Sequence, residues 1–256
     1  TKRNEWLTEQ LSSDKKMLKL ISKEQLELAE KFGDDRRSEI VPSSDDFNYE
    51  DLIKEEQIVV SLTKDGYIKR VPADTFKTQG RGGKGVIAVK GREEDEAADI
   101  YVGSTHDQFL FFTNQGNLLK KKGYEIPLSS RTNKGIHTAN LLALSPDEKV
   151  SSTINLRTLD SDGYFVMITK NGLIKRSEIR EYDTSLRKRG LKALTLKEGD
   201  ELVHVDKTDG NTDILLVTKD GFAVRYNEDV VKSVGRAGLG ERSMILRLND
   251  NIVSML

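Results

Sequence analysis

The sequence contains no cysteine, only four prolines and no long apolar run. Without cysteine, the chain can form neither disulfides nor thiolate metal sites, and it has no cysteine nucleophile. No stretch approaches the roughly 18 apolar residues that a membrane-spanning helix needs, and the N-terminus lacks the apolar stretch of a secretory signal. This composition is compatible with a reducing cytoplasm. Because the chain begins with Thr1 in place of methionine, we expect it to be a piece of a longer protein.

Neither sign of charge dominates, because 41 Lys and Arg residues face 42 Asp and Glu residues, for a net charge of −1. This balance argues weakly against a nucleic-acid-binding protein, but it hides an asymmetry along the chain. Residues 1–56 hold 10 basic and 15 acidic residues, whereas residues 57–256 hold 31 basic and 27 acidic ones. Within the second part, residues 61–92 carry eight basic and two acidic residues. Basic charge is therefore concentrated locally, and local potential matters more to a polyanion than the total charge.

The N-terminal part of the chain has the pattern of a helical segment. Apolar residues recur at mostly helical spacing, Ser12 or Ser13 can cap the helix start, and Gly33 can end it. The segment is either a surface helix packed on a domain or one arm of a helical hairpin whose partner is missing. Residues 41–56 follow as a predicted linker, which is rich in Pro, Ser and Asp over residues 41–50.

From about residue 57 the pattern changes to short apolar runs separated by turns, and an internal repeat begins. Each repeat contains an apolar run, a turn that ends in glycine, and a second run that ends in a basic residue. Asp-Gly and Asn-Gly between such runs indicate β-hairpins in which both turn residues have positive φ. The motif occurs four times, with turn glycines spaced 50, 56 and 49 residues apart, at Thr63–Arg70, Thr113–Lys120, Thr169–Arg176 and Thr218–Arg225.

A second element follows each hairpin: a basic residue and then a glycine that lies 18 or 19 residues after the turn glycine. A repeat of about 50 residues with roughly four strands predicts an all-β, propeller-like fold built from blades. Residues 57–250 hold four units, and residues 251–256 resemble the opening strand of a fifth, so we expect the array to continue beyond this chain. The basic residues and glycines are Arg81 and Gly85, Arg131 and Gly135, Arg187 and Gly190, and Arg236 and Gly240.

The first of these segments is unusually rich in glycine. Four glycines among seven residues leave backbone N–H groups uncovered, and such groups can form an anion-binding concavity beside two cations. The loop can position a sugar-phosphate backbone, but it cannot read base edges. A glycine linker between strands or a small-phosphate loop would have the same composition, whereas a nucleotide-binding P-loop does not match. The loop consists of Gln79, Gly80, Arg81, Gly82, Gly83, Lys84 and Gly85.

Basic residues also recur at the ends of the hairpin strands and in the loops that follow them. A ring of cations at blade spacing would neutralise phosphates along an arc, and the added contacts would offset a bending energy of about 1–6 kcal/mol. Strand ends are often basic and solvated, so the recurrence carries more weight than any single residue. The candidate DNA-binding residues outside the glycine loop are Lys69, Arg70, Lys120, Lys121, Lys122, Arg131, Lys134, Lys175, Arg176, Arg187, Lys188, Arg189, Arg225 and Arg236.

Three segments resemble one known family. Gln79–Gly85 resembles the gyrase A box, the heptad that marks the C-terminal domain of bacterial DNA gyrase A, although Gly80 stands where the family usually has a basic residue. Glu27–Ile40 is similar to the end of the coiled-coil arm of the gyrase A core. Ser104–Gly116 is similar to the second blade of the family's C-terminal domain.

The resemblance implies a fold and a function. Residues 1–40 would be the end of the coiled-coil arm, and residues 57–256 a β-pinwheel, a propeller-like disc whose blades exchange strands. Double-stranded DNA would wrap around the basic rim with positive handedness, so that ATP-dependent gyrase adds negative supercoils. The rest of gyrase A and the gyrase B protein would be partners in an A2B2 assembly in the bacterial cytoplasm. ATP and Mg²⁺ would bind elsewhere in that assembly, so we expect no cofactor and no metal in this chain.

Two features of the sequence resemble catalytic or metal-binding sites, but we expect neither to be one. Family members cleave DNA with a tyrosine that follows an arginine, and Arg225 with Tyr226 forms such a pair. The pair lies in a predicted blade strand, and the family's cleavage tyrosine belongs to the core upstream of this chain, so we expect no catalytic residue here. The histidines lack metal-ligand spacing and are His106, His137 and His204.

Two alternatives remain open. The paralogous protein of topoisomerase IV shares the fold, but it usually has a degraded box, so the nearly intact heptad disfavours it. A propeller that binds only other proteins would show the same strand pattern and no DNA affinity. A supercoiling assay separates the first alternative, and the salt dependence of DNA binding separates the second.

Overall fold

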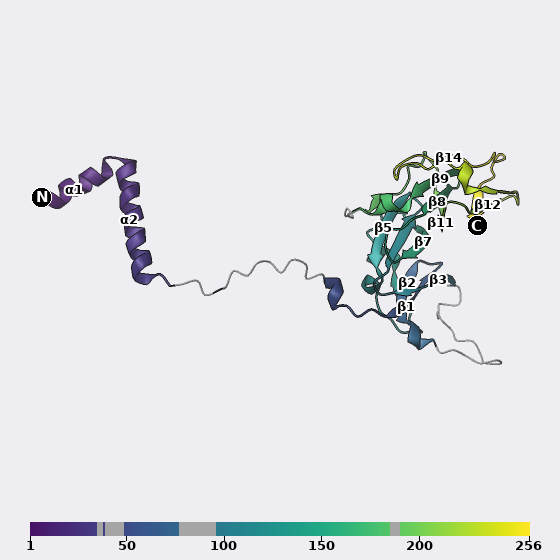
Figure 1. Cartoon of the computed structure of the whole chain (residues 1–256), viewed down its shortest axis with the longest axis horizontal. Coiled ribbons are helices and arrows are strands. Elements are labelled where there is room, and N and C mark those ends of the chain that lie inside the picture. The colour runs from purple at the N-terminus through teal and green to yellow at the C-terminus, as the bar shows by residue number, and fades with distance from the viewer. Residues whose placement is uncertain (35–37, 39–48, 77–95, 185–189) are drawn as a thin grey trace. The chain divides into compact units, whose positions relative to one another are not determined.

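The computed structural model describes residues 1–34, 38, 49–76, 96–184 and 190–256. The chain divides into two compact units, Thr1–Asn48 and Tyr49–Leu256, which are described separately. The first unit contains two helices, α1 (Lys2–Leu11) and α2 (Asp14–Phe32) (Figure 1). No residue of either helix is buried. Neither helix, nor any other in the described residues, is long and apolar enough to cross a membrane.

The bounds of α2 are those expected from the sequence. Ser13 occupies the N-cap position and Gly33 the C-cap position. Ser13 has an extended backbone, but its hydroxyl makes no capping hydrogen bond, and Gly33 has φ of −68°, so the helix ends without a left-handed residue. Apolar side chains such as Leu18 and Phe32 are 65% and 70% exposed, so the apolar face of this helix has no cover within the unit.

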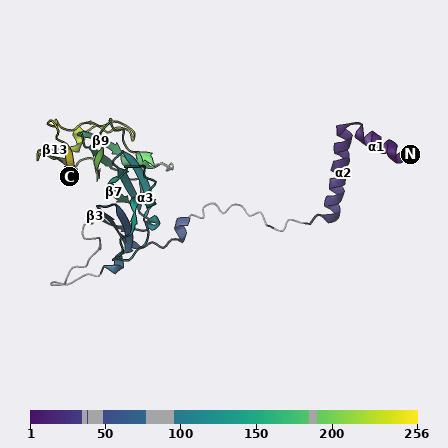
Figure 2. The same ribbon diagram turned by 180° about the vertical axis from the view of Figure 1, so that it is seen from behind.

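The second unit is built from four antiparallel sheets, which we call blades 1 to 4. The innermost strand of each blade follows the hairpin in the chain, and the strand orders are β3-β1-β2-β6, β7-β4-β5-β10, β11-β8-β9-β14 and β15-β12-β13. Figure 1 shows the blades following one another along an arc, and Figure 2 shows the same succession from behind, from β3 through β7 and β9 to β13. The prediction of an all-β fold of repeated blades is confirmed. The strands are β1 (Gln57–Thr63), β2 (Tyr67–Pro72), β3 (Ala97–Ser104), β4 (Gln108–Thr113), β5 (Asn117–Lys122), β6 (Ile136–His137), β7 (Val150–Leu156), β8 (Tyr164–Thr169), β9 (Leu173–Glu178), β10 (Leu191–Lys192), β11 (Leu202–Thr208), β12 (Asp213–Thr218), β13 (Ala223–Asn227), β14 (Glu241–Arg242) and β15 (Ile252–Met255).

Short helical turns complete the unit. A four-residue helix, α3, follows β6, and single 3₁₀ turns precede β1 and follow the second strand of each hairpin. Residues 49–56 pack onto blade 2, because Glu50 pairs with Lys122 and Glu55 with Arg157. The helical elements are α3 (Thr138–Leu141), η1 (Tyr49–Leu52), η2 (Ala73–Thr75), η3 (Gly123–Glu125), η4 (Ile179–Tyr182) and η5 (Glu228–Val230).

Blades exchange their outermost strands, as the resemblance implied. The short strand β6 follows the blade 2 hairpin in the chain, but it pairs with β2 of blade 1. In the same way β10 pairs with β5, and β14 pairs with β9. Each of these blades is therefore completed by the repeat that follows it, which couples neighbouring blades through backbone hydrogen bonds.

The four predicted hairpins are present, but their turn type differs from the prediction. Only the glycine of each turn has positive φ, with 81° at Gly66 and 75° at Gly116, and Asp65 keeps negative φ. In the first turn the N–H of Gly66 donates to the carbonyl of Thr63 over 2.9 Å, and the hydroxyl of Thr63 accepts from the N–H of Tyr67. This is a three-residue loop, a type I turn followed by a left-handed glycine, in place of the expected two-residue turn. The threonine before each turn favours the longer loop because its hydroxyl accepts from the N–H of the residue that follows the turn glycine.

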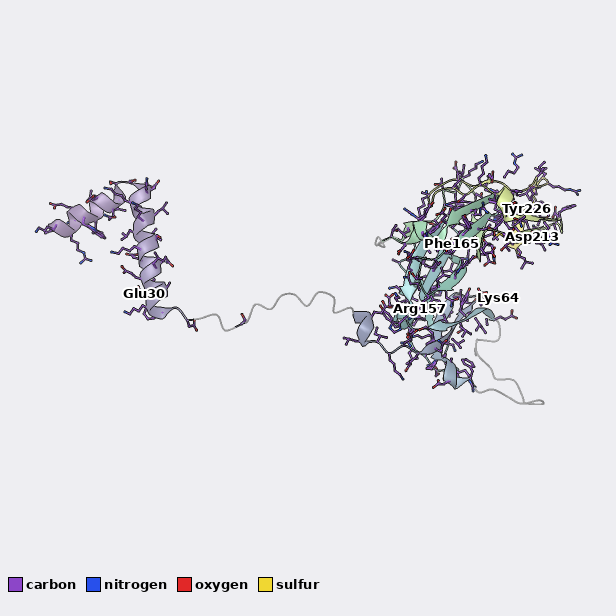
Figure 3. The ribbon with its side chains drawn as sticks, in the orientation of Figure 1. Glu30, Lys64, Arg157, Phe165, Asp213 and Tyr226 are labelled. Carbon is purple, nitrogen blue, oxygen red and sulfur yellow. The ribbon has the colours of Figure 1, made fainter. Side chains whose placement is uncertain are left out.

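Hydrophobic cores lie between the blades. Strand β4 contributes Phe109 and Phe111 to the core shared with blade 1, and Leu110 and Phe112 to the core shared with blade 3. Alternate side chains of one strand point to opposite faces, so a strand that is covered on both faces is apolar throughout. Phe165 of blade 3 packs edge-on against Phe112 with the ring centroids 5.4 Å apart and lies inside the β unit (Figure 3).

The innermost and outermost strands can be told apart by their contacts. Strand β7 contacts β3 through the hydrogen bond from Asn155 to the carbonyl of Val102, and β11 contacts both β7 and β15. Strands β3, β7, β11 and β15 therefore lie together on the inner side of the array, and β6, β10 and β14 lie at its rim. The prediction that residues 251–256 open a fifth blade is wrong, because β15 pairs with β12 and is the innermost strand of blade 4. Its apolar pattern resembles β1 because apolar side chains of both strands pack into a core between blades, as Ile252 and Met255 do in β15.

Candidate nucleic-acid interface

The rim of the array is formed by the outermost strands and by the loops that enter them. We call these rim loops, and the described ones are residues 127–135 before β6 and residues 231–240 before β14. Each rim loop ends in a glycine that lies against the preceding hairpin: a Cβ at Gly135 would lie 2.4 Å from the carbonyl oxygen of Ile68, and one at Gly240 2.6 Å from that of Ile174. The close approach explains why the sequence keeps glycine at a fixed distance after each hairpin.

Backbone hydrogen bonds fix the rim loops further. The N–H of Arg70 donates to the carbonyl of Pro127 over 3.0 Å, and the N–H of Ser129 donates to the carbonyl of Arg70 over 3.0 Å. In blade 3 the N–H of Val234 donates to the carbonyl of Arg176 over 2.9 Å. Each rim loop therefore runs alongside the second strand of a hairpin from the preceding repeat.

Two of the predicted DNA-binding lysines lie in the interior. Lys69 and Lys175 are each 1% exposed. The ammonium group of Lys69 donates to the carbonyl oxygens of Arg131 and Asn133, each over 2.6 Å. That of Lys175 donates to the carbonyl oxygen of Ala193 over 2.7 Å and to that of Arg236. The prediction that Lys69 and Lys175 contact DNA is wrong for this structure, because both faces of their strands are covered and no phosphate can reach them.

Lys120 behaves in a similar way. It is half-buried, and its ammonium group donates to the carbonyl oxygens of Tyr182 and, over 3.1 Å, Thr184. Burial lowers the pKa of Lys120 and of Lys69. All three lysines thus bind peptide carbonyls of a rim loop or of the residues that lead into one.

Several other predicted cations are paired with carboxylates. Arg176 lies 3.7 Å from the fully buried carboxylate of Glu228 and stacks over the ring of Tyr164. Arg225 is exposed and binds Asp213 over 2.6 Å. Lys121 binds Glu125 over 2.8 Å, and Lys122 binds Glu50 over 2.7 Å. The guanidinium of Arg70 donates to the carbonyl of Ile126 over 2.6 Å. These ion pairs and the hydrogen bond of Arg70 partly offset the positive charge of the side chains within the protein.

The rim loops themselves keep basic side chains near the surface. The half-exposed guanidinium of Arg131 makes no hydrogen bond or ion pair with another described residue. Lys134 lies over the ring of Tyr67, 3.7 Å from its centroid. Arg236 is half-exposed, and its guanidinium donates to the carbonyl of Lys192 over 2.7 Å. These three residues lie on the described rim loops, and their contact with DNA stays a prediction.

The structure adds a set of residues that the sequence reasoning missed. The second residue of each outermost strand is exposed and follows the rim-loop glycine by two positions. It is Lys192 in β10 and Arg242 in β14, whereas in β6 it is His137, whose Nδ1 accepts from the N–H of Ala139. The ammonium of Lys192 and the guanidinium of Arg242 have no ion-pair partner among the described residues. A strand of two residues has no periodicity to detect, so only the fixed distance from the glycine could have revealed this set: His137, Lys192 and Arg242.

Part of the predicted interface lies outside the described residues. This holds for the whole glycine loop over Gln79–Gly85, with Arg81 and Lys84, and for the triplet Arg187, Lys188 and Arg189. The described neighbours on either side of the triplet are Thr184 and Gly190. Among the residues that the structure describes, no group of three or more acidic or histidine side chains could hold a metal ion.

Tyr226 lacks the surroundings of a nucleophile. It lies in β13 beside Ile214 of β12, close to Asp213 in Figure 3. Its phenol oxygen is buried and has no hydrogen-bond partner in the described part of the chain. Burial, with a smaller contribution from Glu241, raises the pKa of Tyr226 to about 12, which disfavours the phenolate. The predicted position of Tyr226 in a blade strand is confirmed.

Comparison with known proteins agrees with this geometry. The chain matches the family described as "DNA gyrase C-terminal domain, beta-propeller" over residues 57–103, 107–156, 163–209 and 212–256. The chain belongs to the DNA gyrase C-terminal domain family. The four matched segments correspond to the four blades, each beginning with its hairpin and ending with its innermost strand.

Curated proteins that are similar to this chain are longer than it. The chain is 43% identical to DNA gyrase A of Clostridium acetobutylicum over 230 residues, and 40% identical to that of Staphylococcus epidermidis over 251 residues. These alignments cover 90% and 97% of the chain but 28% of each relative. The chain thus spans little more than a quarter of these relatives.

Solved structures of gyrase C-terminal domains and their paralogues share the fold. One is the C-terminal domain of DNA topoisomerase IV, with a TM-score of 0.69, 31% identity, and coverage of 79% of this chain and 61% of that one. Another is a DNA gyrase A C-terminal domain, with a TM-score of 0.59, 28% identity, and coverage of 78% and 64%.

Proposed function

We propose that this domain binds double-stranded DNA without reading its sequence and wraps it around the rim formed by the outermost strands. The observation that carries the proposal is the recurrence of basic side chains at one position of successive rim strands, represented by Lys192 and Arg242. The rim loops add Arg131 and Arg236 from corresponding positions of two repeats. Phosphates of a curved duplex meet such cations in turn, and the contacts offset the bending energy.

Sequence-independent binding follows from the kind of side chain at the rim. Lysine and arginine on short strands and loops reach the sugar-phosphate backbone, whereas no helix or long ribbon projects from the described rim into a groove. The glycine loop, with Arg81 and Lys84, would add a further phosphate contact in blade 1. The wrapped duplex would then be held by backbone contacts alone.

In the whole enzyme, we infer that the wrap supplies DNA to the rest of gyrase. Double-stranded DNA, the gyrase B protein and the remainder of gyrase A would be the partners, with ATP and Mg²⁺ bound elsewhere in the assembly and the enzyme acting in the cytoplasm. A positive wrap followed by strand passage would give negative supercoils. The described part of this domain offers no activated nucleophile, so its contribution would be to bind and direct DNA.

The salt dependence of binding tests the proposal. We expect the affinity of the chain for linear duplex DNA to fall steeply with salt, with a slope of about −0.9 for each phosphate neutralised. Replacing Lys192 and Arg242 with Ala should make the slope shallower by about two contacts. Lys207 on the innermost strand β11 is exposed and provides the control, because Lys207→Ala should leave the slope unchanged. Affinity that is absent or independent of salt would instead support a protein-interaction propeller.

The second candidate function is that of the topoisomerase IV paralogue. It is favoured by the similarity to the topoisomerase IV C-terminal domain in fold and in sequence. An enzyme that carries this domain should then decatenate DNA without introducing negative supercoils. Supercoiling of relaxed plasmid by the reassembled enzyme would exclude that function.

A further inference from the structure

Three basic residues of the hairpin strands use their charge inside the protein. Lys69 and Lys175 are fully enclosed, and Lys120 is half-buried. An ammonium group in the interior loses its hydration, which is unfavourable unless hydrogen bonds replace it. Burial lowers the pKa of all three lysines, as expected for ammonium groups that have lost water.

Packing alone does not require lysine at the positions of Lys69 and Lys175. Strand β5 has Leu119 where β2 has Lys69 and β9 has Lys175, counting from the turn glycine, and β13 has Val224 there. Leu119 is buried, so an apolar residue fills this place between blades. The lysines must therefore contribute something other than bulk, and their hydrogen bonds show what it is.

Lys69 and Lys175 each bind a carbonyl of the rim loop that the following repeat contributes, and Lys175 also binds the carbonyl of Ala193 after β10. Lys69 on β2 reaches the loop before β6, where it binds the carbonyl of Arg131. Lys175 on β9 reaches the loop before β14, where it binds the carbonyl of Arg236. In both repeats the carbonyl belongs to the basic residue that stands at the same place in the sequence motif.

We propose that Lys69 and Lys175 are positioning residues that turn carbonyls of the two described rim loops inward, so that the basic side chains of these loops face the DNA. The proposal rests on the proposed function, because it assigns an internal role to two cations of the predicted DNA-binding set. They would contribute to DNA binding without touching it.

Peptide geometry supports this orientation. In a trans peptide the carbonyl of one residue and the N–H of the next point in opposite directions. Because the carbonyl of Arg131 points inward to Lys69, the N–H of Thr132 points away from the interior. The N–H of Asn133 donates to the carbonyl of Ser130 within the loop, so the outward N–H of Thr132 is the group that lies beside the cation of Arg131. The buried ammonium groups also add positive charge beneath the rim.

Lysine reactivity tests the placement without any substitution. The chain is treated with an amine-acylating reagent, with and without linear duplex DNA, and acylation is measured for each lysine by mass spectrometry. We expect Lys69 and Lys175 to react slowly in both samples, and Lys192 to react quickly in free protein and to be protected by DNA. Rapid reaction of Lys69 that DNA suppresses would overturn the proposal, because it would show direct phosphate contact. If Lys69 and Lys175 react slowly but DNA does not protect Lys192, the result counts against the rim interface, which is the proposed function, and not against the interior placement of the two lysines.

A double-mutant cycle tests whether Lys69 acts through its loop. We expect Lys69→Met to lower DNA affinity about five-fold, and to have little effect when Arg131→Ala is already present, since both changes act on one loop. Lys175 supports a different loop. The effect of Lys175→Met on DNA affinity should therefore be the same in wild type and in a protein that carries Arg131→Ala. The positioning role would be overturned if the fold-changes in DNA affinity caused by Lys69→Met and Arg131→Ala multiplied in the double variant. It would also be overturned if Lys69→Met gave a folded protein with unchanged DNA affinity. If wild-type protein fails to bind DNA, the proposed function fails first.

Discussion

The ammonium group of Lys69 lies 2.6 Å from the carbonyl oxygen of Arg131, a residue 62 positions further along the chain and contributed by the next repeat. Two residues with the same charge, both expected to meet DNA, thus have different roles. One is enclosed between blades and holds a loop, and the other lies on that loop at the rim. The same relationship joins Lys175 to Arg236 in blade 3.

The buried ammonium of Lys175 should make stability depend on pH. Burial lowers the pKa of Lys175 from 10.5 to about 8, with Glu181 of η4 raising it and Arg236 of the rim loop lowering it further. Between about pH 8 and pH 10.5 the unfolded chain therefore binds more protons than the folded one, so the contribution of Lys175 to the free energy of unfolding rises with pH. Chemical denaturation should show wild type gaining on Lys175→Met between about pH 7.5 and pH 9.5.

The control for this titration is Lys197→Met, because Lys197 is exposed and makes no ion pair with a described residue. The stability difference between wild type and Lys197→Met should stay constant over the same interval. A constant difference for Lys175→Met as well would contradict the interior placement of its charge.

Glu228 should be the carboxylate whose loss destabilises the β unit most. It is fully buried, accepts hydrogen bonds from the hydroxyl of Thr208 and the N–H groups of Gly210 and Thr212, and faces Arg176. Glu228→Ala leaves these donors and a buried guanidinium without a partner, so we expect a loss of about 3 kcal/mol in the free energy of unfolding.

Glu178, at the end of β9 in blade 3, provides the control. It is exposed, and Glu178→Ala should change the free energy of unfolding by less than about 0.5 kcal/mol. Urea denaturation of both variants checks the prediction. Similar denaturation midpoints for the two variants would show that the Arg176–Glu228 contact does not stabilise the blade 3 and blade 4 interface.

The rim-loop glycines should tolerate no side chain. Gly135 has φ of 91°, and a Cβ there would lie 2.4 Å from the carbonyl oxygen of Ile68. Gly199 also has positive φ, but a Cβ there would meet nothing within 4 Å, and Asn249 has φ of 65° at the corresponding place. We expect Gly135→Asn to destabilise the protein by about 2 kcal/mol and Gly199→Asn to change stability little. Equal thermal stability of the two variants would contradict the close packing of the rim loop.

The glycine loop should matter for supercoiling more than for relaxation. If Arg81 and Lys84 contact phosphates, replacing both with Ala weakens the wrap and leaves the catalytic core of the assembly intact. We expect enzyme reassembled with this variant to supercoil relaxed plasmid more weakly while it relaxes supercoiled plasmid at nearly the normal rate. Unchanged supercoiling would remove the loop from the interface.

The repeat could be predicted from the sequence because its signals are local. A turn glycine with positive φ and a threonine before it mark each hairpin, and alternating or continuous apolar runs mark the strands. The strand exchange was implied only by the family resemblance, since strands of two residues such as β6 carry no periodic signal. The turn type was mispredicted because the pairing of the threonine hydroxyl with the loop is a property of three dimensions.

The roles of the cations could not be predicted for a physical reason. In a strand with one solvated face, adjacent Lys69 and Arg70 would point to opposite sides and only one would be buried. Strand β2 lies between a neighbouring blade and a rim loop, so neither of its faces is fully solvated. The side chains of Lys69 and Arg70 therefore both donate hydrogen bonds to backbone carbonyl oxygens. The exposed Lys192 and Arg242 were missed because each stands alone between a glycine and a short apolar run.

The topology of DNA closed around the protein tests the wrapping rim most directly. Nicked plasmid is sealed by ligase in the presence of increasing amounts of this chain, and the linking number is measured after the protein is removed. We predict a shift of positive sign that grows with protein concentration, disappears at high salt, and is smaller for the variant with Lys192→Ala and Arg242→Ala. An unchanged linking number in a sample in which the protein is bound to the plasmid would contradict wrapping around the rim.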